Sequence, residues 1–334
     1  MQIIQVQTLG EAELCFPHLF NVSCKKIMRP HIENMFIYIV LSSIFLLTTV
    51  LNLLLIISIH HYKQLQTPTN LLLLSLAVSD FLVGLLMSFQ IIQIDGCWYL
   101  SDLMCTVYYV LNYIITSASV GTMVLISADR YVAICDPLHY STKVSPKRVR
   151  LCVCVCWFLS ALCHTLLMKD NLEEPGLYNS CIGECVVVVN YVAGLVDLIL
   201  TFLGPLTVII FLYMRVFVVA VTQARVMRSH VTSVKVQGSL TVSVKKSELK
   251  AARTLGVVVL VFLICVCPAF FVVITGQDTL LGASTAAFVI CLFSFNSCLN
   301  PVIYACFYPW FRKCLRLIFT LQILQPGSSQ INVL

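Results

Sequence analysis

Long apolar stretches alternate with short polar breaks along almost the whole chain. Polar residues, or glycine and proline, separate seven apolar runs, at residues 35–59, 70–94, 104–134, 149–168, 187–219, 252–275 and 281–306. A helix rises about 1.5 Å per residue, so runs of this length can cross a hydrocarbon core about 30 Å thick. The pattern predicts an all-α membrane protein. We expect a seven-transmembrane helix bundle over 35–306, an extracellular segment over 1–34 and a tail over 307–334.

The composition agrees with this class. Of the 334 residues, 11% are charged and 59% are hydrophobic, whereas a soluble domain carries about 25% charged residues. The stretch MQIIQVQTLG at the start has no basic residues before an apolar segment. No signal peptide is therefore expected, and the first run is expected to act as its own insertion signal.

Lysine and arginine predict the orientation of the bundle. If the N-terminus is outside, only Lys25, Lys26, Arg29 and Lys169 of the 21 Lys and Arg residues fall outside. This distribution satisfies the positive-inside rule. We expect a multi-pass plasma-membrane protein with an extracellular N-terminus and a cytoplasmic C-terminus. The sequon at Asn21 then lies where glycosylation can occur.

Two cytoplasmic stretches are expected to contact the membrane surface. Pro309 to Leu317 mixes aromatic and aliphatic residues with basic ones, which predicts a short amphipathic eighth helix. Within it, Cys314 follows Arg312 and Lys313 and is a candidate palmitoylation site. The basic loop at 222–250 is typical of a segment that contacts anionic lipid.

The 17 cysteines divide by their predicted side of the membrane. Cysteines within the runs, such as Cys152, Cys154 and Cys156, are expected to be small packing residues, because their alternation puts them on different faces of a helix and disfavours a metal site. Six cysteines lie outside, where disulfides form: Cys15, Cys24, Cys97, Cys105, Cys181 and Cys185. Spacing alone does not assign their pairing.

Two carboxylates lie inside predicted spans, where an ionisable group costs about 2.5–3.5 kcal/mol to insert. Asp80 is either a structural hydrogen-bonding centre or part of a water or sodium network. The polar residues expected to join it are Asn52, Ser119, Asn296 and Asn300. Asp197 is either a packed residue paired with Ser or Asn, or an anion that binds an organic cation. No Lys or Arg lies at its depth to neutralise it, which favours the cationic ligand. His164 is expected to be hydrogen-bonded to a neighbour.

A second charged pair is expected at the cytoplasmic side. Asp129 and Arg130 end the third run, and Glu248 lies at the start of the sixth. A bridge between Arg130 and Glu248 would hold two helices together as a lock that ligand binding releases. The alternative is a simple charge pair at the interface.

Several of these residues, in this order and spacing, resemble the rhodopsin-like G-protein-coupled receptors over essentially the whole chain. They are Asn52, Leu76-Ala77-Val78-Ser79-Asp80, Asp129-Arg130-Tyr131, Trp157, Pro205 with Tyr213, and Asn300-Pro301-Val302-Ile303-Tyr304. The chain is most similar to the trace amine-associated receptors. That subfamily resemblance rests on Cys15-Phe16-Pro17, Asn21-Val22-Ser23-Cys24, the stretch from Lys63 to Asn70, the stretch from Phe307 to Lys313, and the pair Cys181 and Cys185.

The resemblance implies disulfides and switch residues. It implies bridges from Cys105 to Cys185 and from Cys24 to Cys181, which leave Cys15 and Cys97 over. It also implies an activation switch that rearranges when a heterotrimeric G protein enters. The implied switch residues are Asp129, Arg130, Glu248, Tyr213, Asn300, Pro301 and Tyr304.

The chain departs from amine receptors at the ligand pocket. The ammonium-binding Asp of that family lies 18 residues before the Arg of its Asp-Arg-Tyr triplet, and here that position is Asn112. Some fish members instead carry an Asp eight residues before the proline of the fifth span, which here is Asp197. Val266 stands where a Trp is usual and Ser294 where a Tyr is frequent, so a small aliphatic amine is expected. The implied ligand-binding set is Asp197, Asn112, Ser294, Val266 and Phe270.

Three functions are compatible with these features to different degrees. The first is an olfactory receptor for extracellular amines that signals through a stimulatory G protein. The second is a receptor for a non-amine ligand, with Asp197 structural. The third, a cation-coupled transporter, is disfavoured because the chain lacks internal repeats and broken helices. We expect no enzymatic activity, no nucleic-acid partner and no cofactor other than a sodium ion near Asp80.

Overall fold

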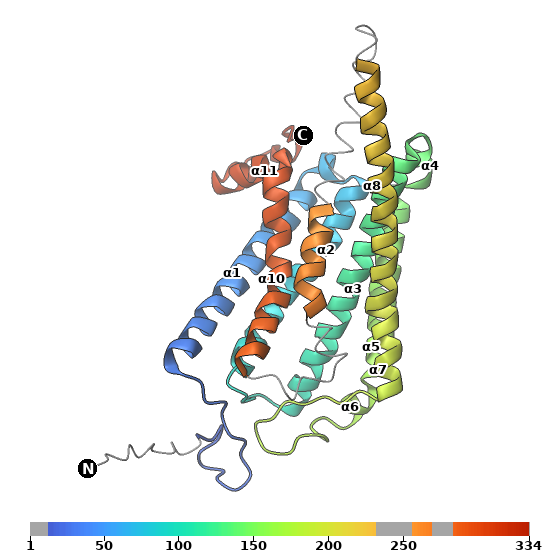
Figure 1. Ribbon diagram of the computed structural model, residues 1–334. Helices are drawn as coiled ribbons and strands as arrows, with labels where there is room; N and C mark the ends of the chain where they lie inside the picture. The colour runs from blue at the N-terminus through green and yellow to red at the C-terminus, as the bar shows by residue number, and fades with distance from the viewer. Residues whose placement is uncertain (1–12, 232–255, 269–282, 334) are drawn as a thin grey trace, which may run out of the picture.

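The computed structural model describes residues 13–231, 256–268 and 283–333, and these form a bundle of long helices (Figure 1). Six of the described helices are long and apolar enough to cross a membrane. They are α1 (His31–His61), α2 (Pro68–Gln93), α3 (Asp102–Cys135), α5 (Pro146–Leu167), the continuous run of α7 (Tyr191–Asp197), η3 (Leu198–Leu203) and α8 (Gly204–Val231), and α10 (Ala283–Phe307). A shorter apolar helix, Gly256–Pro268, lies within the sixth predicted run. The predicted all-helical membrane fold is confirmed.

Shorter elements connect and cover the bundle. The short helices are α4 (Tyr140–Lys143), α6 (Lys169–Glu173) and α11 (Pro309–Phe319), and the single turns are η1 (Lys63–Leu65), η2 (Pro137–His139), η5 (Gln322–Leu324) and η6 (Ser328–Gln330). In α11, the buried side chains are Trp310, Phe311, Cys314 and Leu317. They alternate with basic residues, as expected of a helix whose one face covers a bundle.

Capping residues set several of the helix starts. Thr67 accepts a hydrogen bond from Asn70 N before α2, and Ser145 accepts one from Arg148 N before α5, each followed by proline at the first helical position. The fifth run was predicted to begin at 187, but its helix begins at Tyr191. Asn171 holds Val188 extended by bonds to both its N–H and its carbonyl, at 3.1 and 2.8 Å.

Helix α3 lies at the centre of the bundle, next to α2, α5 and α8. A polar chain links three of these helices inside the apolar core. Trp157 Nε1 on α5 donates to Ser75 Oγ on α2 at 3.1 Å, and Ser75 Oγ lies 3.1 Å from Thr122 Oγ1 on α3. Buried polar groups of this kind are stable only when they are paired, so the chain fixes how the three helices meet.

The two ends of the bundle differ. At one end, which we call the disulfide end, Cys15 pairs with Cys97, Cys24 with Cys181 and Cys105 with Cys185. The last two bridges were implied by the family resemblance, but the expectation that Cys15 and Cys97 are left over is wrong. The opposite end holds α11 and the tail, which we call the α11 end (Figure 1).

Candidate functional site

Asp197 is the last residue of α7, directly before the π-helical segment η3. Its carbonyl accepts a hydrogen bond from Thr201 Oγ1 at 2.8 Å. The side chain is 19% exposed, so it is neither sealed in the core nor fully open. Short π-helical insertions often lie at functional sites, because they redirect side chains within a helix.

The structure gives Asp197 a partner that the sequence argument did not. His164 Nε2 on α5 lies 3.1 Å from Asp197 Oδ1. The expectation that this carboxylate is unpartnered, or pairs only with Ser or Asn, is therefore wrong. The expectation that His164 is hydrogen-bonded to a neighbour is confirmed. The His164 ring also lies against Tyr113 of α3, with ring centroids 5.8 Å apart.

Two other implied ligand residues share a small cavity between α2, α3 and α10. Asn112 and Ser294 both line a space of about 40 Å³, and Ser294 Oγ donates to Gln90 Oε1 at 3.3 Å. That volume holds a few waters, since one water needs about 10–15 Å³ measured this way. Asp197 does not line this cavity.

The remaining implied ligand residues lie in or beside the helix Gly256–Pro268. Val266 is 2% exposed and belongs to the apolar core. Phe270 lies outside the described residues.

Asp80 of α2 is buried among polar side chains of α10. Asn300 Nδ2 donates to Asp80 Oδ2 at 2.8 Å. Among the described residues, Asp80 Oδ1, Asn296 Oδ1 and Asn300 Oδ1 are buried without a hydrogen-bond partner. Oxygen atoms of this kind suit water or a small hard cation.

These oxygens fit the sodium or water network that the sequence predicts, which stays a prediction. Ser119 is buried as well, but no hydrogen bond between described residues joins it to Asp80.

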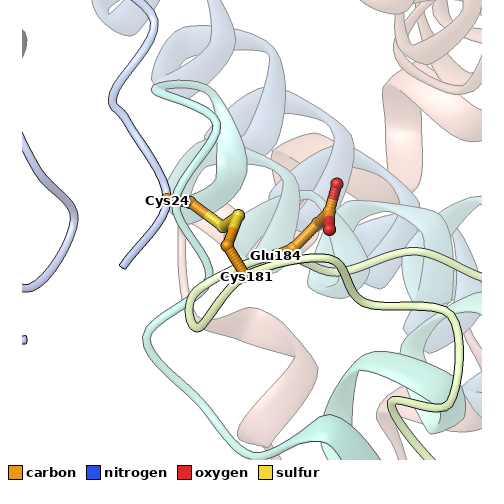
Figure 2. A group of neighbouring side chains, drawn as sticks. All are labelled: Cys24, Cys181 and Glu184. Atoms are coloured by element: carbon orange, nitrogen blue, oxygen red, sulfur yellow. A yellow bond between two sulfur atoms is a disulfide. The ribbon is translucent and has the colours of Figure 1, made fainter. Parts of the chain in front are cut away.

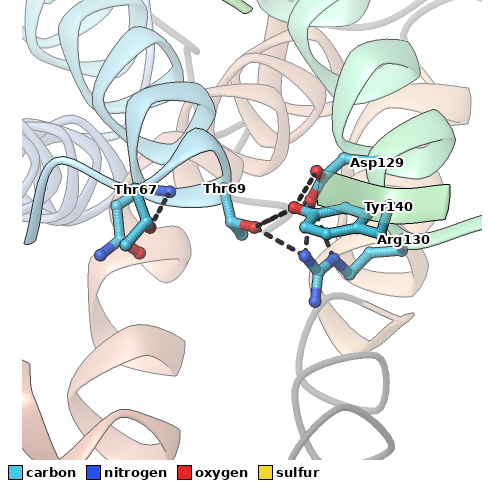
Figure 3. Close-up of polar contacts among 6 residues, drawn as sticks. Thr67, Thr69, Asp129, Arg130 and Tyr140 are labelled. Carbon is cyan, nitrogen blue, oxygen red and sulfur yellow. Dashed lines mark hydrogen bonds and ion pairs between the residues drawn. The ribbon is translucent and has the colours of Figure 1, made fainter. Parts of the chain in front are cut away.

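At the α11 end, the ends of α2 and α3 meet α4 in a network of charged and hydroxyl groups (Figure 3). Arg130 Nη2 donates to Asp129 Oδ2 and to Thr69 Oγ1, each at 2.6 Å. Thr69 Oγ1 also donates to Asp129 Oδ2 at 2.9 Å, and Tyr140 OH donates to Asp129 Oδ1 at 2.8 Å. The Asp129 and Arg130 side chains are 3% and 5% exposed.

Other implied switch residues lie near this end or outside the described chain. Glu248, the predicted partner of Arg130, lies outside the described residues. The hydroxyls of Tyr213 and Tyr304 are buried and, in the described part of the chain, have no hydrogen-bond partner. Pro301 lies inside α10 one residue after Asn300. Polar groups that are buried but unpaired are suited to form new contacts when the helices move.

The disulfide end has a second, larger cavity of about 650 Å³ that opens to the surface and is lined in part by Cys181 and Glu184. The sulfur atoms of Cys24 and Cys181 and a carboxylate oxygen of Glu184 lie within 4.8 Å of one another. Figure 2 shows the two sulfur atoms joined to each other. Neither cysteine therefore offers a thiolate, and this group is not a metal site.

Two predicted modification sites have contrasting surroundings. Asn21 is exposed at the disulfide end. Cys314 lies on the buried face of α11, and burial raises the pKa of its thiol to about 11. A thiol so placed has little reactive thiolate, so palmitoylation at Cys314 would require α11 to move.

The sequence did not predict which polar side chains pair with Asp129 and Asp197. Thr69, Tyr140 and His164 each pair with a charged residue that it had identified, but they lie 60, 11 and 33 positions away from it. Thr69 and Tyr140 carry no signal apart from being polar. His164 was a usable signal, since it is an ionisable group inside a predicted span.

Comparison with known proteins gives a consistent result. The profile of the family described as 7 transmembrane receptor (rhodopsin family) matches residues 51–304. The chain is 36% identical to trace amine-associated receptor 13c of Danio rerio, over 98% of this chain and 98% of that protein. It is 37% identical to trace amine-associated receptor 8 of Homo sapiens, over 96% of each chain. It is also 37% identical to trace amine-associated receptor 6 of Pan troglodytes, over 97% of this chain and 96% of that protein.

Proposed function

The chain belongs to the rhodopsin family of seven-transmembrane receptors and, within it, to the trace amine-associated receptors, and from this we propose that it binds small extracellular amines through Asp197. It is a multi-pass membrane receptor and not an enzyme, with a small-molecule ligand and a G protein as partners. The proposal adds the class of ligand, the residue that binds it and the direction of signalling.

The observation that carries the proposal is the position of Asp197. It is a partly exposed carboxylate within the span Tyr191–Val219, towards the disulfide end. The third helix has neutral Asn112 where amine receptors carry their acid. A carboxylate that is held in a mostly apolar bundle and still reachable attracts a cation strongly, because little water screens it.

The size of the ligand follows from the lining residues. Ser294 replaces the larger aromatic residue frequent in amine receptors, and Val266 is buried in the core. Two positions that carry aromatic rings in many amine receptors therefore offer none to a ring-bearing ligand. We propose small aliphatic amines, detected from outside the cell in olfactory tissue.

The same proposal assigns the sides of the membrane and the signalling partner. The disulfide end faces outside, where bridges form and Asn21 can be glycosylated. The α11 end faces the cytoplasm, next to anionic lipid and a stimulatory G protein. The buried Asp129–Arg130 pair lies at that end.

The test is the replacement Asp197→Ala in cells that report cyclic AMP. We expect the variant to reach the cell surface and to lose its response to primary, tertiary and diamines, by about a hundredfold or more in potency, because an unpaired ammonium is costly to bury. The matched control is Asp170→Ala, which removes an exposed carboxylate of α6. A full amine response from the Asp197→Ala receptor would contradict the proposal.

One observation favours a second function. Asp197 already has an ionisable partner in His164, so the carboxylate is explicable as a structural group in a receptor for a non-amine ligand. A screen of neutral odorants and peptides beside the amines separates the two functions. A response to a neutral compound that persists in Asp197→Asn would support the second.

A further inference from the structure

The hydrogen bonds of His164 determine where its protons lie. Its Nδ1 lies 2.7 Å from the carbonyl oxygen of Ser160, one turn back on α5. A carbonyl oxygen only accepts hydrogen bonds, so Nδ1 carries a proton and donates it. His164 is 1% exposed, so bulk solvent does not compete with Ser160 for Nδ1.

The other ring nitrogen then faces a second acceptor. If His164 is neutral and protonated at Nδ1, Nε2 carries only a lone pair. Asp197 Oδ1, 3.1 Å away, is also an acceptor when ionised. Two lone pairs at that distance repel, so the observed contact requires one more proton between Nε2 and Oδ1. Whichever atom holds it, the His164–Asp197 pair carries one shared proton and is neutral overall.

Few other groups can supply or take up that proton. Among the described residues, Asp197 is the ionisable group that lies within hydrogen-bonding distance of the His164 ring. From α3, Tyr113 lies against the imidazole ring, and Tyr109 lies four residues before Tyr113 on the same helix. Phenols ionise near pH 10, so both stay neutral in physiological media. On α5 itself the neighbouring ionisable side chain is Cys163, which is exposed.

We propose that an ammonium ligand binds Asp197 in exchange for this proton, so that His164 makes the amine affinity of the receptor depend on pH. The inference rests on the proposed function, since it needs Asp197 to bind the amine. The step balances in charge and protons: the neutral pair and a cationic amine give neutral His164, ionised Asp197 and the ammonium, and one proton leaves to the solvent. The N–H groups of the ammonium replace the shared proton as donors to Nε2 and Oδ1. If the proton stayed, an imidazolium and an ammonium would share one carboxylate and repel.

This exchange gives the pH dependence a definite sign. Proton release means that raising the pH favours binding, by up to about tenfold in affinity per pH unit while the free pair holds its proton. The ligand does not reverse this trend, because a primary alkylamine keeps its charge until about pH 10. His164 is therefore a positioning residue that also sets how strongly protons compete with the amine.

The experiment measures the released proton directly. The purified full-length receptor in lipid nanodiscs is titrated with pentylamine by calorimetry at about pH 6.5, in two buffers with different ionisation enthalpies. We expect release of close to one proton per bound amine. No proton release by the wild-type receptor, with pentylamine bound, would overturn the proposal, and this result does not depend on any variant folding.

The variant His164→Gln supplies the matched comparison. A glutamine amide reaches a similar distance, donates an N–H to Asp197 and does not titrate. We expect it to bind pentylamine without proton release and with an affinity that is flat between about pH 6 and pH 8. The same proton release as the wild type would also overturn the exchange. These results differ from those expected if the proposed function itself fails. If Asp197 does not bind the amine, the Asp197→Ala receptor would bind pentylamine as well as the wild type does.

Discussion

Asp129 accepts hydrogen bonds from three different segments, and these donors together stabilise its buried carboxylate. Arg130 comes from the same helix, Thr69 from the start of α2 and Tyr140 from α4. Burial, and then the charge of Asp129, raise the pKa of Tyr140 to about 12. The phenol therefore stays protonated at physiological pH and remains a donor to the carboxylate. Losing a hydrogen bond to a buried charged group costs about 1.5–3 kcal/mol.

We expect Tyr140→Phe to raise ligand-independent signalling several-fold, because the Asp129 carboxylate that binds Arg130 is then held in place by one hydrogen bond fewer. The measurement is basal cyclic AMP normalised to surface receptor. Ser141→Ala is the control, since Ser141 is the exposed neighbour of Tyr140. Unchanged basal signalling at normal surface levels would show that the Tyr140 bond does not restrain the receptor.

At the scale of elements, α1 and α2 approach closely at a glycine. A Cβ built on Gly84 would lie 2.7 Å from Thr49 Oγ1 and 3.2 Å from Thr49 N. The second atom belongs to the backbone of α1 and cannot rotate away. Small residues allow such close approach in membrane helices, where dispersion contacts rather than water exclusion drive association. Gly256 has more space: a Cβ at this position would lie 3.6 Å from its nearest neighbour, Tyr213 Cε1.

We expect Gly84→Ala to destabilise the receptor by about 1–3 kcal/mol through overpacking of α1 against α2. Gly256→Ala is the matched control and should leave the stability unchanged or raise it slightly. Alanine favours a helix more than glycine does, and its methyl group would lie at an ordinary van der Waals distance from the nearest atom. Thermal unfolding of the two purified variants in detergent gives the comparison. Equal melting temperatures for both would contradict the close approach.

At the scale of the whole molecule, three segments distant in sequence form the disulfide end. Cys15–Cys97 and Cys24–Cys181 close separations of 82 and 157 residues, and Cys105–Cys185 closes one of 80. Backbone bonds accompany them: Ile182 N donates to Val22 O at 2.8 Å, and Trp98 N donates to Gly183 O at 2.7 Å. The N-terminal segment is thus attached to both neighbouring loops.

We expect the double replacement Cys15→Ser with Cys97→Ser to lower the stability of the receptor by up to about 4 kcal/mol, since a long loop is no longer closed in the unfolded chain. The segment stays attached through Cys24–Cys181, so surface delivery should persist. Limited proteolysis of the N-terminal segment and the melting temperature report the change, with Cys152→Ser, an exposed free cysteine, as the control. A melting temperature equal to that of the control would show that this bridge adds no stability.

The sequence by itself determined the class of the molecule and the places where its chemistry had to lie. Apolar runs long enough to span a bilayer are a local property, because a helix satisfies its own backbone inside lipid. Charges inside such runs are costly, so Asp80 and Asp197 could be identified without knowing what surrounds them. The motif spacing likewise indicated the family, and the family resemblance implied two of the three disulfides.

The tertiary structure alone decided which group each of these residues meets. His164 and Asp197 lie 33 positions apart, and Thr69 and Asp129 lie 60 apart. Cys15 and Cys97 pair across 82 residues. Neither hydrophobic periodicity nor composition specifies which faces of two helices meet; side-chain packing and the pairing of buried polar groups do. The sequence predicts that Asp197 has no ionisable partner within the protein, but in the folded chain its carboxylate is already paired with the His164 imidazole.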